Sequence, residues 1–238
     1  ASKESQHVLS LSDPVGGNFR LLGVPFDTEL SMVSAVSEIV SSAGWKLRTL
    51  LRTRRFYTDA DLIVLYTAHL LSYLEYRTPA IYHATRTVLK RLDAVQARFL
   101  RDIGVDDITA LTTFHLAPLS ARRDIAMLGV IHRTILGEGP DQFKDFFRRD
   151  PTHPVKLLDP RQASRSPLTK RSALGLVAIY NMLPQNVLDF QTVPAFQKGL
   201  QGILSKYAMS GHPQWSEVFS PRLPLASHPL IHLNRLPQ

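Results

Sequence analysis

The stretch "LSMVSAVSEIVSSAGWKLRTLLRTRRF", residues 30–56, has a clear helical periodicity. Its apolar residues recur at spacings of three and four, which places them on one face of an α-helix. They are Met32, Val33, Val36, Ile39, Val40, Ala43, Leu47, Leu50 and Leu51. Gly44 lies within this stripe, and we expect a bend there. The stretch therefore predicts a long amphipathic helix whose second half is basic.

The residues just before this helix predict a strand and not a helix. "FRLLGVPFD", residues 19–27, predicts a short strand from Phe19 to Val24, closed by Pro25. Asp27 or Thr28 can then cap the helix that follows. We therefore expect a small β element at the N-terminal side of a helical chain.

Three further helices are predicted after residue 56. Thr58 and Asp61 have the spacing of a capping box, and that helix ends or kinks at Pro79. The next helix covers about 85–103 and ends at Gly104, a favourable C-terminal cap. Another long helix follows Pro118. Together these segments predict a bundle of about four long helices.

The domain organisation follows from these elements. We predict a mainly α fold, with a helical bundle at 28–148 and a β element within 1–27. Residues 149–170 contain four prolines and predict a linker. Residues 171–238 predict a helical appendage with an irregular tail.

The composition limits the function. The 238 residues are 44% hydrophobic and 20% charged, a globular balance, and no apolar run approaches the ~20 residues of a membrane span. The chain has no Cys, which excludes disulfides, Cys-ligated zinc and a thiol nucleophile, and favours an intracellular compartment. The net charge of +8 is concentrated, because residues 45–101 hold eleven basic and four acidic residues. Such a basic block predicts an anionic partner.

The basic residues fall into two helical groups. The first group is Lys46, Arg48, Arg52, Arg54 and Arg55, with no acid among them. On the helix at 85–103, Lys90, Arg98 and Arg101 share a face opposite the apolar stripe. Neighbouring helices with basic outer faces can follow a phosphate backbone. An ordinary solvated face remains the alternative.

Two aromatic residues, Phe56 and Tyr57, end the first basic helix. They could stack on a base or sugar. We favour the interpretation that they close the helix end hydrophobically.

No catalytic motif is present in the sequence. Asp106-Asp107 is a pair of carboxylates of the kind that can hold two Mg²⁺ ions. In polymerases such a pair lies on a tight hairpin between strands, whereas here it follows a helix and Gly104. We therefore predict that it caps the next helix.

The order of five segments resembles the end of the reverse transcriptase domain of LINE-type non-LTR retrotransposons, with the region behind it. The first segment is the hydrophobic-Leu-Gly segment "FRLLGVPFD". The others are "YTDADLIVLYTAHLLSYLEYRTPAIYHA" (57–84), "LKRLDAVQARFLRDIGV" (89–105), "HLAPLSARRDIAMLGVIHRTIL" (115–136) and "YNMLPQNVLDFQTVPAFQKGL" (180–200). The match is loose residue by residue and correct in order. It covers about 19–204.

The resemblance implies specific roles. Leu22 and Gly23 would belong to the primer grip beside the palm, and the helices behind them would form the thumb. This part would hold an RNA template and a DNA primer on its basic helices. The family's catalytic carboxylates and their Mg²⁺ lie in upstream palm motifs that this sequence does not contain. We therefore expect no polymerase activity and no cofactor in this chain alone, and a nuclear location.

Two other functions remain open. A helical interaction module would meet an acidic protein through the same basic face. A decayed retroelement remnant would have no selected function. A metal-dependent nuclease is a weaker alternative, because no carboxylate cluster supports it.

Overall fold

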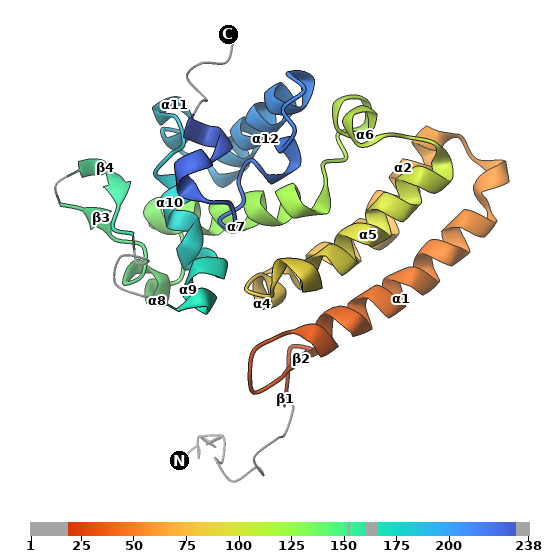
Figure 1. Cartoon of the computed structure of the whole chain (residues 1–238), viewed down its shortest axis with the longest axis horizontal. Coiled ribbons are helices and arrows are strands. Elements are labelled where there is room, and N and C mark those ends of the chain that lie inside the picture. The colour runs from red at the N-terminus through yellow and green to blue at the C-terminus, as the bar shows by residue number, and fades with distance from the viewer. Residues whose placement is uncertain (1–18, 152, 160–165, 232–238) are drawn as a thin grey trace, which may run out of the picture.

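The computed structural model describes residues 19–151, 153–159 and 166–231, and these are predominantly helical, as the sequence predicts. The parts of the predicted N-terminal element before residue 19, of the linker at 160–165 and of the tail after residue 231 lie outside the described residues. Two hydrophobic cores organise the described chain, one between residues 24 and 119 and the other between residues 82 and 230. Figure 1 shows the corresponding two groups of helices side by side.

The N-terminal element is a hairpin instead of the single strand expected at 19–24. β1 (Phe19–Leu21) pairs antiparallel with β2 (Val24–Phe26), and Leu22 and Gly23 form the two-residue turn. Both turn residues have positive φ, 49° and 77°, which is the backbone of a type I′ turn. The predicted small β element is confirmed, but the single strand from Phe19 to Val24 is wrong, because the Leu-Gly pair is the turn between two strands.

The first core is built on two helices that run in the same direction. α1 (Val33–Arg52) packs along α5 (Arg86–Ile103) through its predicted apolar stripe. α1 continues through Gly44 as one helix, and a single 3₁₀ turn, η1 (Arg54–Phe56), follows it. The Asp27 carboxylate accepts hydrogen bonds from the backbone N–H groups of Ser31 (2.7 Å) and Met32 (2.9 Å), so Asp27 holds the entry to α1.

A helical segment that changes pitch covers one side of α1. It consists of α2 (Asp59–Tyr66), the wider π-helical turn η2 (Thr67–Leu71), α3 (Ser72–Glu75) and α4 (Thr78–Ile81). Thr58 and Asp61 form the predicted capping box. Pro79 lies in the first turn of α4, where its missing N–H costs no helical hydrogen bond, so it begins a helix after the preceding one has ended.

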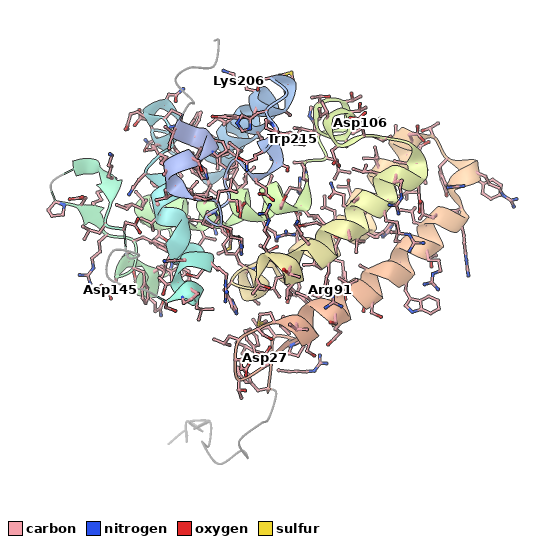
Figure 2. All side chains as sticks on the ribbon, viewed as in Figure 1. Asp27, Arg91, Asp106, Asp145, Lys206 and Trp215 are labelled. Carbon is pink, nitrogen blue, oxygen red and sulfur yellow. The ribbon has the colours of Figure 1, made fainter. Side chains whose placement is uncertain are left out.

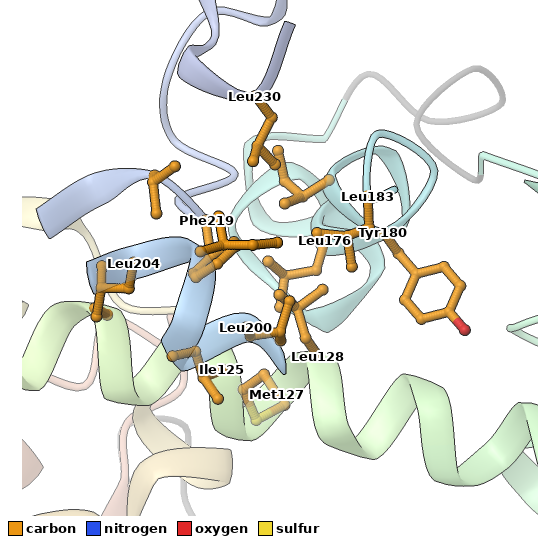
Figure 3. Packing of buried hydrophobic residues seen from close by; sticks show 14 of the residues in the cluster. Ile125, Met127, Leu128, Leu176, Tyr180, Leu183, Leu200, Leu204, Phe219 and Leu230 are labelled. Carbon is orange, nitrogen blue, oxygen red and sulfur yellow. The ribbon is translucent and has the colours of Figure 1, made fainter. Parts of the chain in front are cut away.

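α6 (Asp107–Phe114) and α7 (Leu119–Ile135) follow α5. Gly104 caps α5 in the left-handed conformation with φ 75°, as predicted. α7 was expected within the bundle at 28–148, but much of its buried surface belongs to the second core. Figure 3 shows Ile125, Met127 and Leu128 of α7 beneath residues of the C-terminal half.

The second core surrounds α7 with short elements and one long helix. Its elements are α8 (Asp141–Lys144), β3 (Arg149–Asp150), β4 (His153–Leu157), α9 (Pro167–Arg171), η3 (Ala173–Leu176), α10 (Val177–Tyr180), α11 (Gln185–Leu188), α12 (Val193–Met209), η4 (Trp215–Glu217) and η5 (Leu225–Ser227). α12 packs along α7, and Phe219 and Leu230 of the C-terminal segment are buried in the same core. The predicted linker at 149–170 is therefore partly structured. β3 pairs with β4, and Leu157 is buried against the second core.

Candidate nucleic-acid interface

The outer face of α1 carries arginine beside an exposed tryptophan. Trp45, Arg48 and Arg52 lie opposite the buried stripe, and the Arg48 guanidinium stands 5.0 Å from the centroid of the Trp45 ring. Trp45 is 63% exposed, a large fraction for an indole. The sequence analysis did not select Trp45. Its position opposite the apolar stripe is the signal that could have identified it.

The end of α1 continues this face. The Arg55 guanidinium lies 4.7 Å from the centroid of the Phe56 ring. Phe56 is 69% exposed and Tyr57 is 47% exposed, so the expectation that they close the helix end hydrophobically is wrong. Two exposed rings beside arginines form a surface on which flat groups can stack.

Arg54 has a structural role. Its Nη1 donates a 3.0 Å hydrogen bond to the backbone carbonyl of Asp102, in the last turn of α5. A cation is favourable there, because the last carbonyls of a helix lack intrahelical partners and carry partial negative charge. This bond holds the C-terminal ends of α1 and α5 together.

The predicted cations of α5 are divided between its two ends. Arg98 and Arg101 lie near the joined C-terminal ends, where Arg98 forms an i,i+4 ion pair of 3.6 Å with Asp102. Lys90 lies eleven residues before Arg101, which corresponds to roughly 16 Å along the helix. Lys46 faces α3, with its ammonium 5.2 Å from the centroid of the Tyr73 ring. Lys46 and Lys90 therefore lie apart from the main group.

We name the group at the joined ends the basic–aromatic face. Its members are Trp45, Arg48, Arg52, Arg54, Arg55, Phe56 and Tyr57 on α1 and the turn after it, with Arg98 and Arg101 at the adjoining end of α5. Within the described part of the chain, no acidic side chain pairs with Arg48, Arg52, Arg55 or Arg101. The face therefore keeps an excess of positive charge open to a ligand.

The hairpin turn lies far from this face. Arg20 of β1 forms a two-pronged ion pair with Glu38 of α1, with a shorter contact of 2.9 Å, which anchors the hairpin to the start of that helix. Along α1, Trp45 lies roughly 18 Å and Arg52 roughly 28 Å from Val33, so the helix separates Leu22 and Gly23 from the basic–aromatic face. Leu22 itself is 82% exposed at positive φ, an unfavourable backbone for a branched side chain.

The Asp106-Asp107 pair acts as the predicted helix cap. Asp106 Oδ1 accepts hydrogen bonds from the N–H groups of Ile108 and Thr109, both 2.9 Å long, at the start of α6 (Figure 2). The hydrogen bond from the Thr109 hydroxyl is the largest influence that lowers the pKa of Asp106, whereas partial burial raises the pKa of Asp107. No group of three or more acidic or histidine side chains in the described residues could hold a metal ion.

Comparison with known proteins gives no relative. No family model matches the chain, and neither a curated protein nor a solved structure matches it. Among the described residues, no helix combines the length and apolar character needed to cross a membrane. The candidate site is therefore defined by its geometry and not by a relative.

Proposed function

We propose that this chain is a nucleic-acid-binding helical module that holds strands on its basic–aromatic face. The observation that carries the proposal is the row formed by Arg48, Arg52 and Arg55, exposed and unpaired among the described residues, with Trp45 against Arg48 and Phe56 against Arg55. Arginine attracts phosphate groups whatever the base sequence of the nucleic acid, and exposed rings add stacking on bases or sugars.

The resemblance to LINE-type reverse transcriptases supports a thumb-like role. In that role the module would hold an RNA template and its DNA primer, and Leu22-Gly23 would contribute to the primer grip. The chemistry, addition of deoxynucleotides assisted by Mg²⁺, would belong to carboxylates outside these helices. Along α1, the basic–aromatic face covers roughly 18 to 28 Å from the end of the helix nearest the hairpin, which corresponds to about five to eight base-pair steps of a duplex, since each step rises about 3.4 Å.

A gel-shift titration of an RNA–DNA hybrid at several salt concentrations tests this function. If about five cations contact phosphates, the logarithm of the binding constant falls with the logarithm of salt concentration at a slope near −4 to −5. A response that does not depend on salt would remove the proposal. Strong binding to an acidic protein together with weak binding to the hybrid would instead identify a protein-interaction module.

A further inference from the structure

A second basic surface lies at the other end of α5, in a cleft of about 860 Å³. Its walls come from the first residues of α5, from α9 and from the segment 221–225. Four of its lining residues are cations, Arg86, Lys170, Arg171 and Arg222, whereas Asp159 is the acidic lining residue. Arg86 is paired with Glu217 and Arg222 lies 4.0 Å from Asp124, so the excess of positive charge in the cleft comes from Lys170 and Arg171.

Arg222 lines the cleft and is held there by neighbouring backbone. Its Nη2 donates to the backbone carbonyls of Tyr82 and Ala84, and its guanidinium lies 4.9 Å from the centroid of the Tyr82 ring. Its Nε is buried and has no hydrogen-bond partner among the described residues. This atom has almost no accessible surface, so the guanidinium is held by its backbone partners and does not turn its Nε toward the cleft.

Lys170 and Arg171 can reach a ligand more freely. Arg171 Nε donates a 3.2 Å hydrogen bond to the carbonyl of His83, which fixes the stem of the side chain. The terminal nitrogens of Arg171 and the ammonium of Lys170 have no acidic partner among the described residues. Arg171 is therefore held in place, and both Arg171 and Lys170 keep their positive charge available to a ligand.

The start of α5 adds hydrogen-bond donors to the same cleft. Thr85 caps this eighteen-residue helix, and Arg86 and Thr87 follow it in the first turn. The N–H groups of a first turn have no intrahelical acceptor and carry the positive end of the helix dipole. Together with the cations of α9, they suit a phosphate group.

The opposite wall of the cleft is apolar. Pro221, Leu223, Pro224 and Leu225 line it. The volume is within the range of sites for small organic ligands and exceeds what a phosphate ion alone would fill. An organic body attached to the phosphate would bury apolar surface against this wall.

We propose that the cleft binds a small phosphate monoester of nucleotide size. The phosphate lies between Lys170, Arg171 and the first turn of α5, and the organic body lies against the wall at 221–225. The site is separate from the basic–aromatic face, because α5 extends for about 26 Å between its two ends. Failure of nucleic-acid binding at that face would leave this proposal intact.

Isothermal titration of the whole chain with adenosine 5′-monophosphate tests the proposal. We expect saturable binding of the monophosphate, at least tenfold weaker binding of inorganic phosphate, and no binding of adenosine. A dinucleoside monophosphate, whose phosphate is a diester, should bind at least tenfold more weakly than the monoester. Equal binding of the diester, or no heat from millimolar monophosphate, would overturn the proposal.

Two variants locate the site. Lys170→Glu should weaken binding of the monophosphate at least tenfold, whereas the matched charge reversal Lys206→Glu on α12 (Figure 2) should leave it unchanged. Leu225→Ala should weaken binding of the monophosphate while binding of inorganic phosphate stays the same. Equal effects of Lys170→Glu and Lys206→Glu, with both proteins melting as the wild type does, would show that the cleft is not the site.

Discussion

The Tyr82 hydroxyl donates a 2.5 Å hydrogen bond to Asp124 Oδ1, and both residues are buried. Tyr82 belongs to the second core but directly follows Ile81 of the first core, and Asp124 lies in α7, so the bond stands where the two cores meet. Arg222 Nη1 lies 4.0 Å from the same carboxylate oxygen. A buried carboxyl group thus stands at the junction between the two cores.

Asp124 should make stability depend on pH. Burial raises the pKa of its carboxyl group from 3.8 to about 7, against the opposing effects of Arg222 and of the Tyr82 hydrogen bond. Since the folded pKa is the higher one, the stability contribution is complete below pH 3.8 and is lost as the pH rises to about 7. The wild type should therefore lose stability relative to Asp124→Asn between pH 4 and pH 8. Urea unfolding of both proteins across this range measures the difference in their free energies of unfolding. A difference that does not change with pH would contradict the raised pKa of Asp124.

Charge reversal on α1 and the turn after it should weaken nucleic-acid binding whatever the base sequence. Replacing Arg52 and Arg55 together by Glu removes two phosphate contacts, so the salt slope should become shallower by about 2. The matched control is Lys198→Glu with Lys206→Glu, which changes the net charge equally on α12. If the control weakens binding as much, the effect comes from overall charge and not from the basic–aromatic face.

Trp45→Ala separates stacking from charge. Because Trp45 is exposed, we expect a change in unfolding free energy within about 0.5 kcal/mol. Binding of single-stranded RNA should weaken by about 1–3 kcal/mol if a base stacks on the indole. Tyr76→Ala removes another exposed ring, directly after α3, that is not a member of the basic–aromatic face, and should leave fluorescence-anisotropy titrations unchanged. Identical titrations for wild type and Trp45→Ala would exclude a stacking role.

Leu22→Asn should stabilise the hairpin. Leu22 has φ 49° in a two-residue turn whose backbone favours Asn followed by Gly, and a left-handed backbone costs other residues about 1–2 kcal/mol. We expect the free energy of unfolding, measured with a chemical denaturant, to rise by about 0.5–1 kcal/mol. Gly23→Ala should lower the free energy of unfolding, because Ala cannot adopt φ 77° without strain. A loss of stability in Leu22→Asn would show that the leucine side chain contributes packing.

Asp106→Ala should cost stability without altering any metal-dependent activity. The variant loses the side-chain acceptor for two N–H groups of α6, so its free energy of unfolding should fall. The pKa of Asp106 is lowered in the folded state, so this stabilisation is present above pH 3.8 and disappears on acidification. Asp107→Ala should cost less, since burial already raises the pKa of that carboxyl group. A Mn²⁺-dependent nuclease activity lost in Asp106→Ala would contradict the capping role.

Local sequence patterns predicted several elements correctly. The spacing of apolar residues gave α1 and α5, and the Thr58–Asp61 pair and Gly104 marked helix ends. These features depend on side chains within one or two helical turns, so the neighbouring sequence contains the necessary information. The turn at Leu22 was missed because leucine carries no signal for positive φ.

The candidate interface was only partly predictable. Helical periodicity placed Arg48 and Arg52 on the outside of α1, and it placed Trp45 there as well. It could not show that Arg54 would bind the end of α5, or that Lys46 would turn toward Tyr73. Those positions depend on which helices become neighbours.

By itself, the sequence determined the helical class, the main helix boundaries and the concentration of positive charge behind the hairpin, because each follows from residues close together in the chain. Only the tertiary structure assigned α7 to the second core, buried part of the predicted linker, and brought Arg222 to Tyr82 and Asp124. These outcomes arise when surfaces distant in sequence exclude water from each other. A periodic stripe specifies that a face will be buried, and the packed fold decides which partner buries it.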